Sequence, residues 1–360
     1  MIDVLLQVPQ YILFRHIGRP RKLPINITLS VTYHCNSRCK TCNIWRKRGN
    51  GEELSLEELD LIFRSLGKTP YWFTISGGEP FLRRDLADIC RSIYHHCEPG
   101  IINIATNGLL CDIIAETVSQ IAASCPRTHL VINLSLDGIG GEHDNLRGVP
   151  GNWDRAMRTY RTLKSLDHSN LEIGVHTVIS RHNVNSLSQI YEYVTAELKP
   201  DSYITEIAEE RVELDTIGAG ITPSLEEYVT AIDYLSPKIK QSRFSGISRI
   251  TQAFRLQYYT FVKQTMRRKR QVIPCYAGFA SAQIAPDADV WMCCIKAEPI
   301  GNLRDADYDF RKVWFSRKAN ELRRRIKSKE CYCPMANASY TSMLHHLPTL
   351  AKVGWRVLTS

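Results

Sequence analysis

The chain has 360 residues, 44% of them hydrophobic and 23% charged, which is enough for one large globular domain and a smaller one. A net charge of +9 fits an anionic cofactor, an acidic substrate or a membrane surface, and we expect no nucleic-acid partner. No signal peptide and no apolar run of membrane-spanning length is visible, which predicts a cytoplasmic protein. In that reducing compartment the twelve cysteines favour metal binding over disulfides.

Residues 1–22 form an amphipathic segment. Apolar residues from Val4 to Phe14 precede Arg15, Arg19 and Arg21. Such a segment can lie on the inner face of an anionic membrane or dock on its own domain.

Residues 23–236 alternate strand-like and helical stretches. Six segments have the pattern of strands: 27–33, 71–76, 101–106, 130–136, 171–179 and 202–207. Six β–α repeats predict an α/β fold, a partial (β/α)6 TIM-like barrel with its chemistry at the carboxyl ends of the strands. Ser55 and Glu58 form a capping box at a helix start, and Pro223 is predicted at a first helical position.

The remaining residues change in character. A helical linker is expected over 237–270, followed by a small α+β unit over 271–340. That unit contains a predicted hairpin of 281–284 and 290–293 and a basic helix near 310–326. An apolar, basic tail over 341–360 carries Trp355.

Three thiols follow the first strand, Cys35, Cys39 and Cys42. Thiolates hold zinc or iron–sulfur clusters, and a closed zinc site needs a fourth ligand. The neighbouring His34 points the opposite way in an extended strand. Three thiolates on a cubane leave one iron open for an exchangeable ligand, whereas a structural zinc knuckle is the alternative.

The spacing C-x-x-x-C-x-x-C after the first strand of a β/α barrel resembles the radical S-adenosylmethionine (SAM) superfamily. The resemblance implies a [4Fe–4S] cluster on these three cysteines, with the amino and carboxylate groups of SAM on the open iron. After the second strand, Gly77, Gly78, Glu79 and Pro80 match the family's glycine-rich segment, which receives the methionyl amino group. Glycines permit close backbone approach, and a carboxylate complements an ammonium.

Later strand ends carry further polar residues. The resemblance implies that Asn107, Ser135 and Asp137 contact the ribose and carboxylate of SAM, although Asn-Gly and Asp-Gly are also common turn dipeptides. The stretch from His143 to Gly148 matches one that is frequent in a subgroup of the family. Thr41 stands where the family often has an aromatic residue, with Trp45 as an alternative for adenine stacking.

The second cysteine group resembles the SPASM or Twitch extension of that superfamily, which holds an auxiliary [4Fe–4S] cluster. The implied ligands are Cys275, Cys293, Cys331 and Cys333, with Cys294 as the alternative to Cys293. Ala288 replaces the usual glycine of the hairpin, and the last two cysteines form C-x-C instead of C-x-x-C. A spare thiol in that pair would leave an open iron, and structural zinc is the other alternative.

Four further cysteines lie in predicted barrel helices or at their ends, and we interpret them as small hydrophobic residues: Cys90, Cys97, Cys111 and Cys125.

Together the two resemblances imply a radical enzyme. A flavodoxin- or ferredoxin-type donor reduces the first cluster, SAM is cleaved to a 5′-deoxyadenosyl radical, and this radical abstracts hydrogen from an unactivated carbon. Glu206, Glu209 and His176 are candidates for an acid or base, but solvated surface acids and a barrel histidine are the simpler interpretation.

The terminal segments favour a small molecule or a lipid- or polyprenyl-linked substrate. A ribosomally made peptide is the alternative, because most SPASM-type relatives act on peptides. A non-catalytic iron–sulfur or zinc protein is a third possibility.

Overall fold

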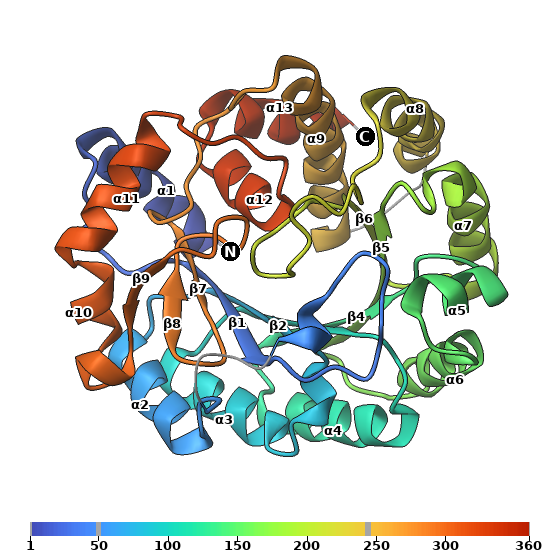
Figure 1. Cartoon of the computed structure of the whole chain (residues 1–360), viewed down its shortest axis with the longest axis horizontal. Helices are drawn as coiled ribbons and strands as arrows, with labels where there is room; N and C mark the ends of the chain where they lie inside the picture. The colour runs from blue at the N-terminus through green and yellow to red at the C-terminus, as the bar shows by residue number, and fades with distance from the viewer. Residues whose placement is uncertain (1, 48–51, 242–245, 360) are drawn as a thin grey trace.

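The computed structural model describes residues 2–47, 52–241 and 246–359. It is built around one nine-stranded sheet in the order β6-β5-β4-β3-β2-β1-β7-β8-β9 (Figure 1). The first six strands are parallel and curl into a partial barrel: β1 Asn26–Thr32, β2 Trp72–Gly77, β3 Ile101–Thr106, β4 His129–Ser135, β5 Leu171–Ile179 and β6 Ser202–Ile207. The predicted α/β class and partial barrel are confirmed.

Helices cover the convex outer side of these strands: α2 Leu56–Leu66, α3 Leu86–Cys97, α4 Cys111–Ser124, α5 Gly141–Arg147, α6 Asn152–Lys164, α7 Leu187–Tyr193 and α8 Leu225–Gln241. Alternation along the strands decides which side chains meet them. In β1, Ile27 and Leu29 are fully buried in the hydrophobic core, while Thr28 on the opposite side bonds to a polar partner across the concave side. The main core therefore lies between sheet and helices.

The C-terminal hairpin continues the barrel sheet. β7 (Ser281–Ile284) pairs in parallel with β1, and β8 (Asp289–Trp291) and β9 (Pro299–Asn302) follow in antiparallel order. Because β7 pairs with β1, the second cysteine group is brought beside the first strand. The C-terminal unit is thus fused to the barrel through backbone hydrogen bonds.

The predicted helical linker has a structural role in the barrel. α9 (Gly246–Arg268) buries Tyr258 and Tyr259, and the Tyr259 hydroxyl contacts Thr205 of β6. α12 (Ala336–Leu344) reaches β1, where Asn337 donates to Thr28 Oγ1 over 2.6 Å. These helices line the opening between β6 and β7 that the parallel strands leave.

The predicted basic helix is two helices, α10 (Phe310–Trp314) and α11 (Arg317–Lys327). Ser316 separates them because its side chain caps α11, accepting from the amide of Ala319. The capping box of Ser55 and Glu58 is present as predicted. The prediction of Pro223 at a first helical position was wrong: α8 begins at Leu225, and Ser224 caps it together with Glu227.

The terminal helices, α1 (Ile2–Ile17) and α13 (Leu347–Thr359), dock through one face each. Tyr11 of α1 is fully buried and Val353 of α13 is 5% exposed, while Leu13 and Trp355 face outward. None of the helices in the described ranges has the length and apolarity needed to cross a membrane.

Candidate active site

The first three cysteines lie in a loop directly after β1 that is held from two sides. From one side, the amides of Arg38 and Lys40 donate to the carbonyls of Arg147 and Leu146 at the end of α5, each over 2.9 Å. From the other side, the amide of Asn43 donates to the carbonyl of Leu214 over 2.9 Å. The thiols are therefore positioned by segments more than 100 residues away in sequence.

Burial dominates the acidity of Cys35 and Cys42. It raises the pKa of Cys35 to about 11 and the pKa of Cys42 to about 12. The guanidinium of Arg147 opposes this at Cys35, and its Nη1 lies 3.7 Å from the sulfur of Cys39. A buried cation beside the loop favours the thiolates that a metal cluster requires.

The sequence assigned no role to Arg147, which lies in the stretch from His143 to Gly148 that resembles a subgroup of the family. It is 9% exposed and forms an ion pair with Asp137 over 2.9 Å. The Asp137 carboxylate also accepts from the amide of Val178 in β5. Asp137 thus orients Arg147 toward the cysteine loop, an arrangement that no local pattern indicates.

The glycine-rich segment after β2 packs on the backbone that leads into the cysteine loop. The amide of Gly78 donates to the carbonyl of Thr32 over 2.7 Å, and that of Glu79 to the carbonyl of His34 over 2.8 Å. A Cβ atom at Gly77 or Gly78 would overlap these same carbonyl oxygens, and Gly77 has a positive φ of 119°. Only glycines permit this approach.

Glu79 is 1% exposed and its carboxylate is occupied by its own chain. It accepts from the Thr106 hydroxyl and from the amide of Asn107, both over 2.8 Å, and from the amide of Phe81 over 3.3 Å. Burial raises its pKa to about 7. This placement ties the ends of β2 and β3 together, so Glu79 positions the glycine segment.

The other residues expected to contact SAM lie around the same rim. Asn107 donates to the Asn36 side chain over 2.7 Å, inside the cysteine loop, and Ser135 ends β4 in a half-buried position. Pro80 begins a short 3-10 helix and is buried. Arg38 and Arg46 both lie against the ring of Trp45, with their guanidinium carbons 4.6 and 4.7 Å from its centre.

The cysteines of the second group are also brought together. Cys275 interacts electrostatically with Cys293 and Cys331, and Cys333 interacts with Cys275 and Cys293. Burial raises the pKa of Cys275 to about 12. Cys275 lies before β7, Cys293 follows β8, and Cys331 and Cys333 follow α11, so three segments contribute to this group.

Cys294 interacts electrostatically with Cys293 but has other nearest neighbours. It is 6% exposed, its sulfur lies 3.8 Å from that of Met335, and Nη1 of Arg211 lies 4.0 Å from it. Cys293, by contrast, is half-buried and shares the electrostatic environment of Cys331.

Within the described ranges, no three His, Cys, Asp or Glu side chains lie close enough to hold a single metal ion.

The segment after β6, residues 208–216, links the two thiol groups; we call it the bridging segment. The amides of Val212 and Glu213 donate to the carbonyls of Ile295 and Cys294, over 3.1 and 3.3 Å. Its Leu214 is the residue that holds the first cysteine loop. The Glu213 carboxylate contacts Gln283 of β7 and the Ser30 hydroxyl of β1.

The interpretation of Glu206 and Glu209 as solvated surface acids was wrong for both residues. Glu209 is 7% exposed, and its Oε2 has no hydrogen-bond partner in the described part of the chain. Glu206 pairs with His176 over 3.3 Å on the concave side of the barrel. Burial raises the pKa of Glu209 to about 8, and the charge of Arg211 opposes that shift.

The concave side of the barrel is polar along several strands. Asn133 of β4 donates to Asn103 of β3 over 2.6 Å, and His129 pairs with Glu172 of β5 over 2.8 Å. The side chain of Arg255, 5% exposed, enters this region from α9. A substrate in this space would meet hydrogen-bonding groups.

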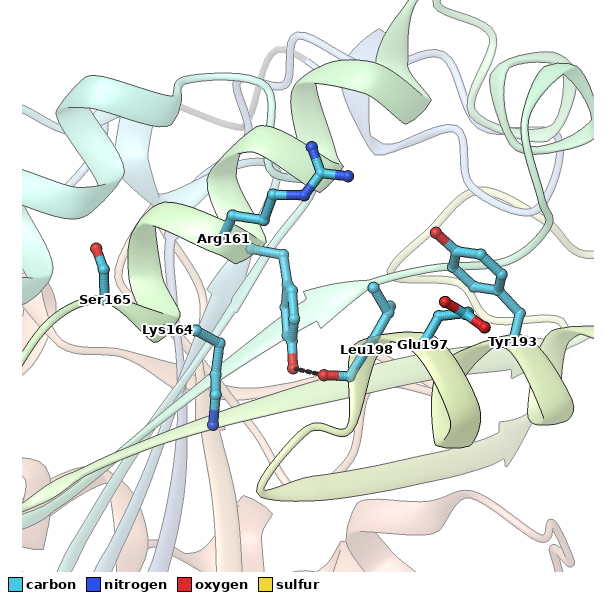
Figure 2. A pocket seen from close by; sticks show the side chains of 7 residues that line it. Arg161, Lys164, Ser165, Tyr193, Glu197 and Leu198 are labelled. Atoms are coloured by element: carbon cyan, nitrogen blue, oxygen red, sulfur yellow. Dashed lines mark hydrogen bonds between the residues drawn. The ribbon is translucent and has the colours of Figure 1, made fainter.

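A separate cavity of about 440 Å³ lies between outer helices, and no cysteine lines it (Figure 2). Tyr160, Arg161 and Lys164 line it from α6, and Tyr193 and Leu198 from α7 and the π-helix Val194–Leu198. The Tyr160 hydroxyl donates to the Leu198 carbonyl over 2.9 Å (Figure 2). This cavity plays no part in the site at the carboxyl ends of the strands.

The structure is a partial parallel barrel with three thiols at its mouth and a second group of thiols in the C-terminal unit. Residues 29–194 match the model of the radical SAM superfamily, and residues 275–334 match that of the SPASM iron–sulfur cluster-binding domain. The chain therefore carries a radical SAM domain followed by a SPASM domain. Its cofactors are a SAM-binding [4Fe–4S] cluster, SAM and an auxiliary iron–sulfur cluster.

Similar proteins include a maturation protein and a maturase. The chain is 29% identical to the sporulation killing factor maturation protein SkfB of Bacillus subtilis, over 47% of this chain and 39% of the relative. It is 30% identical to the mycofactocin maturase MftC of Mycolicibacterium smegmatis, over 46% and 40%. The chain therefore spans about two fifths of the length of these curated relatives.

Among solved structures, SuiB of Streptococcus suis bound to its precursor peptide SuiA superposes with a TM-score of 0.62 at 14% identity, over 87% of this chain and 69% of that one. At this identity the likeness shows the fold.

Proposed function

We propose that the chain is a radical SAM enzyme that modifies a ribosomally made peptide. In this proposal Cys35, Cys39 and Cys42 hold the SAM-binding cluster. The auxiliary cluster is held by Cys275, Cys293, Cys331 and Cys333. The observation that carries the proposal is the hydrogen bonding of the Gly77–Gly78 segment to the backbone that enters the first cysteine loop, which places a glycine cradle beside three thiols.

The residues fit the cofactors they would hold. When bound, the first cluster and SAM supply a 5′-deoxyadenosyl radical that abstracts hydrogen from a substrate carbon. Arg147 places a positive charge 3.7 Å from Cys39, which favours the thiolates. Glu79 fixes the glycine segment against the end of β3, and the bridging segment covers the opening between β6 and β7.

A peptide substrate has more support than the small or lipid-linked molecule expected from the terminal segments. Two relatives are named as maturases, and SuiB was solved with its precursor peptide. The concave side of the barrel presents paired amides, His–carboxylate pairs and Arg255, which suit amide groups better than a hydrocarbon chain.

Glu209 is the acid or base that we favour. Its carboxyl group lies between the barrel mouth and the auxiliary thiols Cys293 and Cys333, and its Oε2 is unpaired within the described residues. With its pKa raised to about 8, this oxygen holds a proton at neutral pH. Glu206 is already engaged by His176, which makes it the weaker candidate.

The test is anaerobic reconstitution of the wild type and of a Cys35→Ala/Cys39→Ala/Cys42→Ala variant. Two cubanes predict about eight irons in the wild type and about half of them in the variant. Only the wild type should form 5′-deoxyadenosine from SAM after reduction. A peptide encoded beside the gene should change mass only in the presence of SAM and active enzyme.

Cys97→Ala serves as the matched control, because Cys97 is a core thiol that is 1% exposed. It should keep the full iron content and activity. Zinc in place of iron, or equal iron in the wild type and the triple variant, would contradict the assignment of the first cluster. Deoxyadenosine formation without any change in the peptide would contradict the substrate class alone.

A further inference from the structure

A strongly basic surface lies on the C-terminal part of the chain. Residues 310–330 contain nine lysines and arginines against two glutamates, a local net charge of +7 in a chain whose total is +9. All of these cations except Arg323 are exposed, and four of them form ion pairs with acidic neighbours: Lys312, Arg317, Arg324 and Arg325. We call the solvent side of α10, α11 and the turn to residue 330 the basic face.

Helical periodicity separates the basic face from a buried face. Arg317 and Arg324, seven residues apart on α11, have side chains that are 94% and 72% exposed. Ala319 and Arg323 point inward, where Arg323 donates to the carbonyls of Gly278 and Trp314. α10 and α11 run along one edge of the molecule (Figure 1), so this charge is presented outward.

The basic face borders the auxiliary thiols. Cys331 follows α11 directly and is half-buried, and the next residue, Tyr332, is 48% exposed. The charges of Lys296 and Arg325 act on the Cys331 thiol. Of the two thiol groups, the auxiliary group therefore lies directly beside this surface.

We propose that the basic face is the docking surface for an acidic electron-transfer protein of the ferredoxin class, which exchanges single electrons with the auxiliary cluster. The inference rests on the proposed function in one respect, namely that this cluster is held by Cys275, Cys293, Cys331 and Cys333. One electron leaves the reduced ferredoxin, which is oxidised, and the auxiliary cluster gains it; no bond forms or breaks.

Charge favours a protein partner over a lipid surface here. Among described residues, large exposed apolar side chains occur on α1 and α13, while none lies within residues 310–330. Insertion into a bilayer needs such side chains beside the cations. An acidic protein needs only opposite charge, which raises association rates by about 10- to 1,000-fold at low salt and is screened as salt rises.

The test uses the full chain with Cys35, Cys39 and Cys42 replaced by alanine, so that the auxiliary cluster alone is reduced. Its reduction by a purified acidic ferredoxin is followed by freeze-quench electron paramagnetic resonance at low and high salt. Adding Arg317→Glu and Arg324→Glu should slow this reduction about tenfold at low salt and abolish most of the salt dependence. Reduction by dithionite, a small molecule, should remain unchanged.

The matched control places the same charge change on another surface, with Arg161→Glu and Lys199→Glu on the outer side of the barrel, both exposed in the wild type. The ferredoxin rate should then match that of the unaltered background. An equal loss in both variants would mean a general charge effect, and an unchanged rate in the α11 variant would place the docking surface elsewhere.

Phospholipid vesicles containing phosphatidylserine provide a second arm. If the α11 variant loses vesicle binding while ferredoxin reduction is unaffected, the basic face belongs to a membrane and the proposal fails. Because no step of the assay requires SAM cleavage, a chain that turns over no SAM leaves this test intact. Absence of a reducible auxiliary cluster would instead contradict the proposed function.

Discussion

Glu58 joins the barrel to the C-terminal unit and offers a sharp test of the structure. Its carboxylate completes the capping box of α2 by accepting from the amide of Ser55 over 2.8 Å. The same carboxylate accepts from Arg304 Nε over 2.7 Å and Nη2 over 3.0 Å, and from the Tyr308 hydroxyl over 2.8 Å. One side chain therefore serves a local cap and a contact 246 residues away.

The magnitude follows from its acidity. The bidentate Arg304 guanidinium is the main reason that the pKa of Glu58 falls from the usual 4.5 to about 2. A difference of about 2.5 in pKa corresponds to about 3 kcal/mol of stability at neutral pH. The Glu58 side chain is 19% exposed and that of Arg304 is 31% exposed, so screening by solvent reduces this figure to about 2 kcal/mol. Because the pKa is lower in the folded state, this contribution is complete above about pH 4.5 and is lost as the pH falls toward 2.

The substitution Glu58→Gln keeps the shape of the side chain and removes its charge. We expect the free energy of unfolding at pH 7 to fall by about 2 kcal/mol, measured by urea denaturation followed by circular dichroism. The difference from wild type should shrink as the pH falls below about 4.5.

Glu57→Gln removes the same charge from the same helical turn at an exposed position, and its effect should stay within about 0.5 kcal/mol. A Glu58→Gln variant as stable as the wild type at pH 7 would refute the contact with Arg304, and a constant difference at pH 3 and pH 7 would refute its electrostatic origin.

Three further predictions concern the cluster sites. Arg147→Met should lower iron retention at the first site severalfold while Arg147→Lys preserves most of it, measured as iron per chain after desalting; equal retention in both would exclude a role for the charge. Cys293→Ser should remove the auxiliary cluster, seen as a loss of about four irons, whereas Cys294→Ser should keep it; the reverse result would exchange the two assignments. Gly78→Ala should reduce SAM binding at least tenfold in an equilibrium binding assay, since its Cβ would meet the His34 carbonyl, and normal binding would show that the loop can shift.

The strands could be predicted from the sequence because their signals are local, and the prediction of the first thiol site depends on equally local signals. Strand alternation placed six strands within one or two residues of their observed bounds. The C-x-x-x-C-x-x-C spacing and the two glycines lie within single loops, and the Ser55–Glu58 box spans one helical turn. Patterns that repeat every two to four residues can be recognised from the sequence alone.

The partners of these features were decided by tertiary structure. Arg147 meets Cys39 across 108 residues, and β7 pairs with β1 across some 250 residues, with no local pattern that announces either contact. The burial of Glu209 also had no signal, because a carboxylate after a strand looks the same whether solvent or a second thiol group faces it. Long-range contacts depend on how the whole barrel closes, and closure is set by packing summed over many residues, which no short stretch of sequence records.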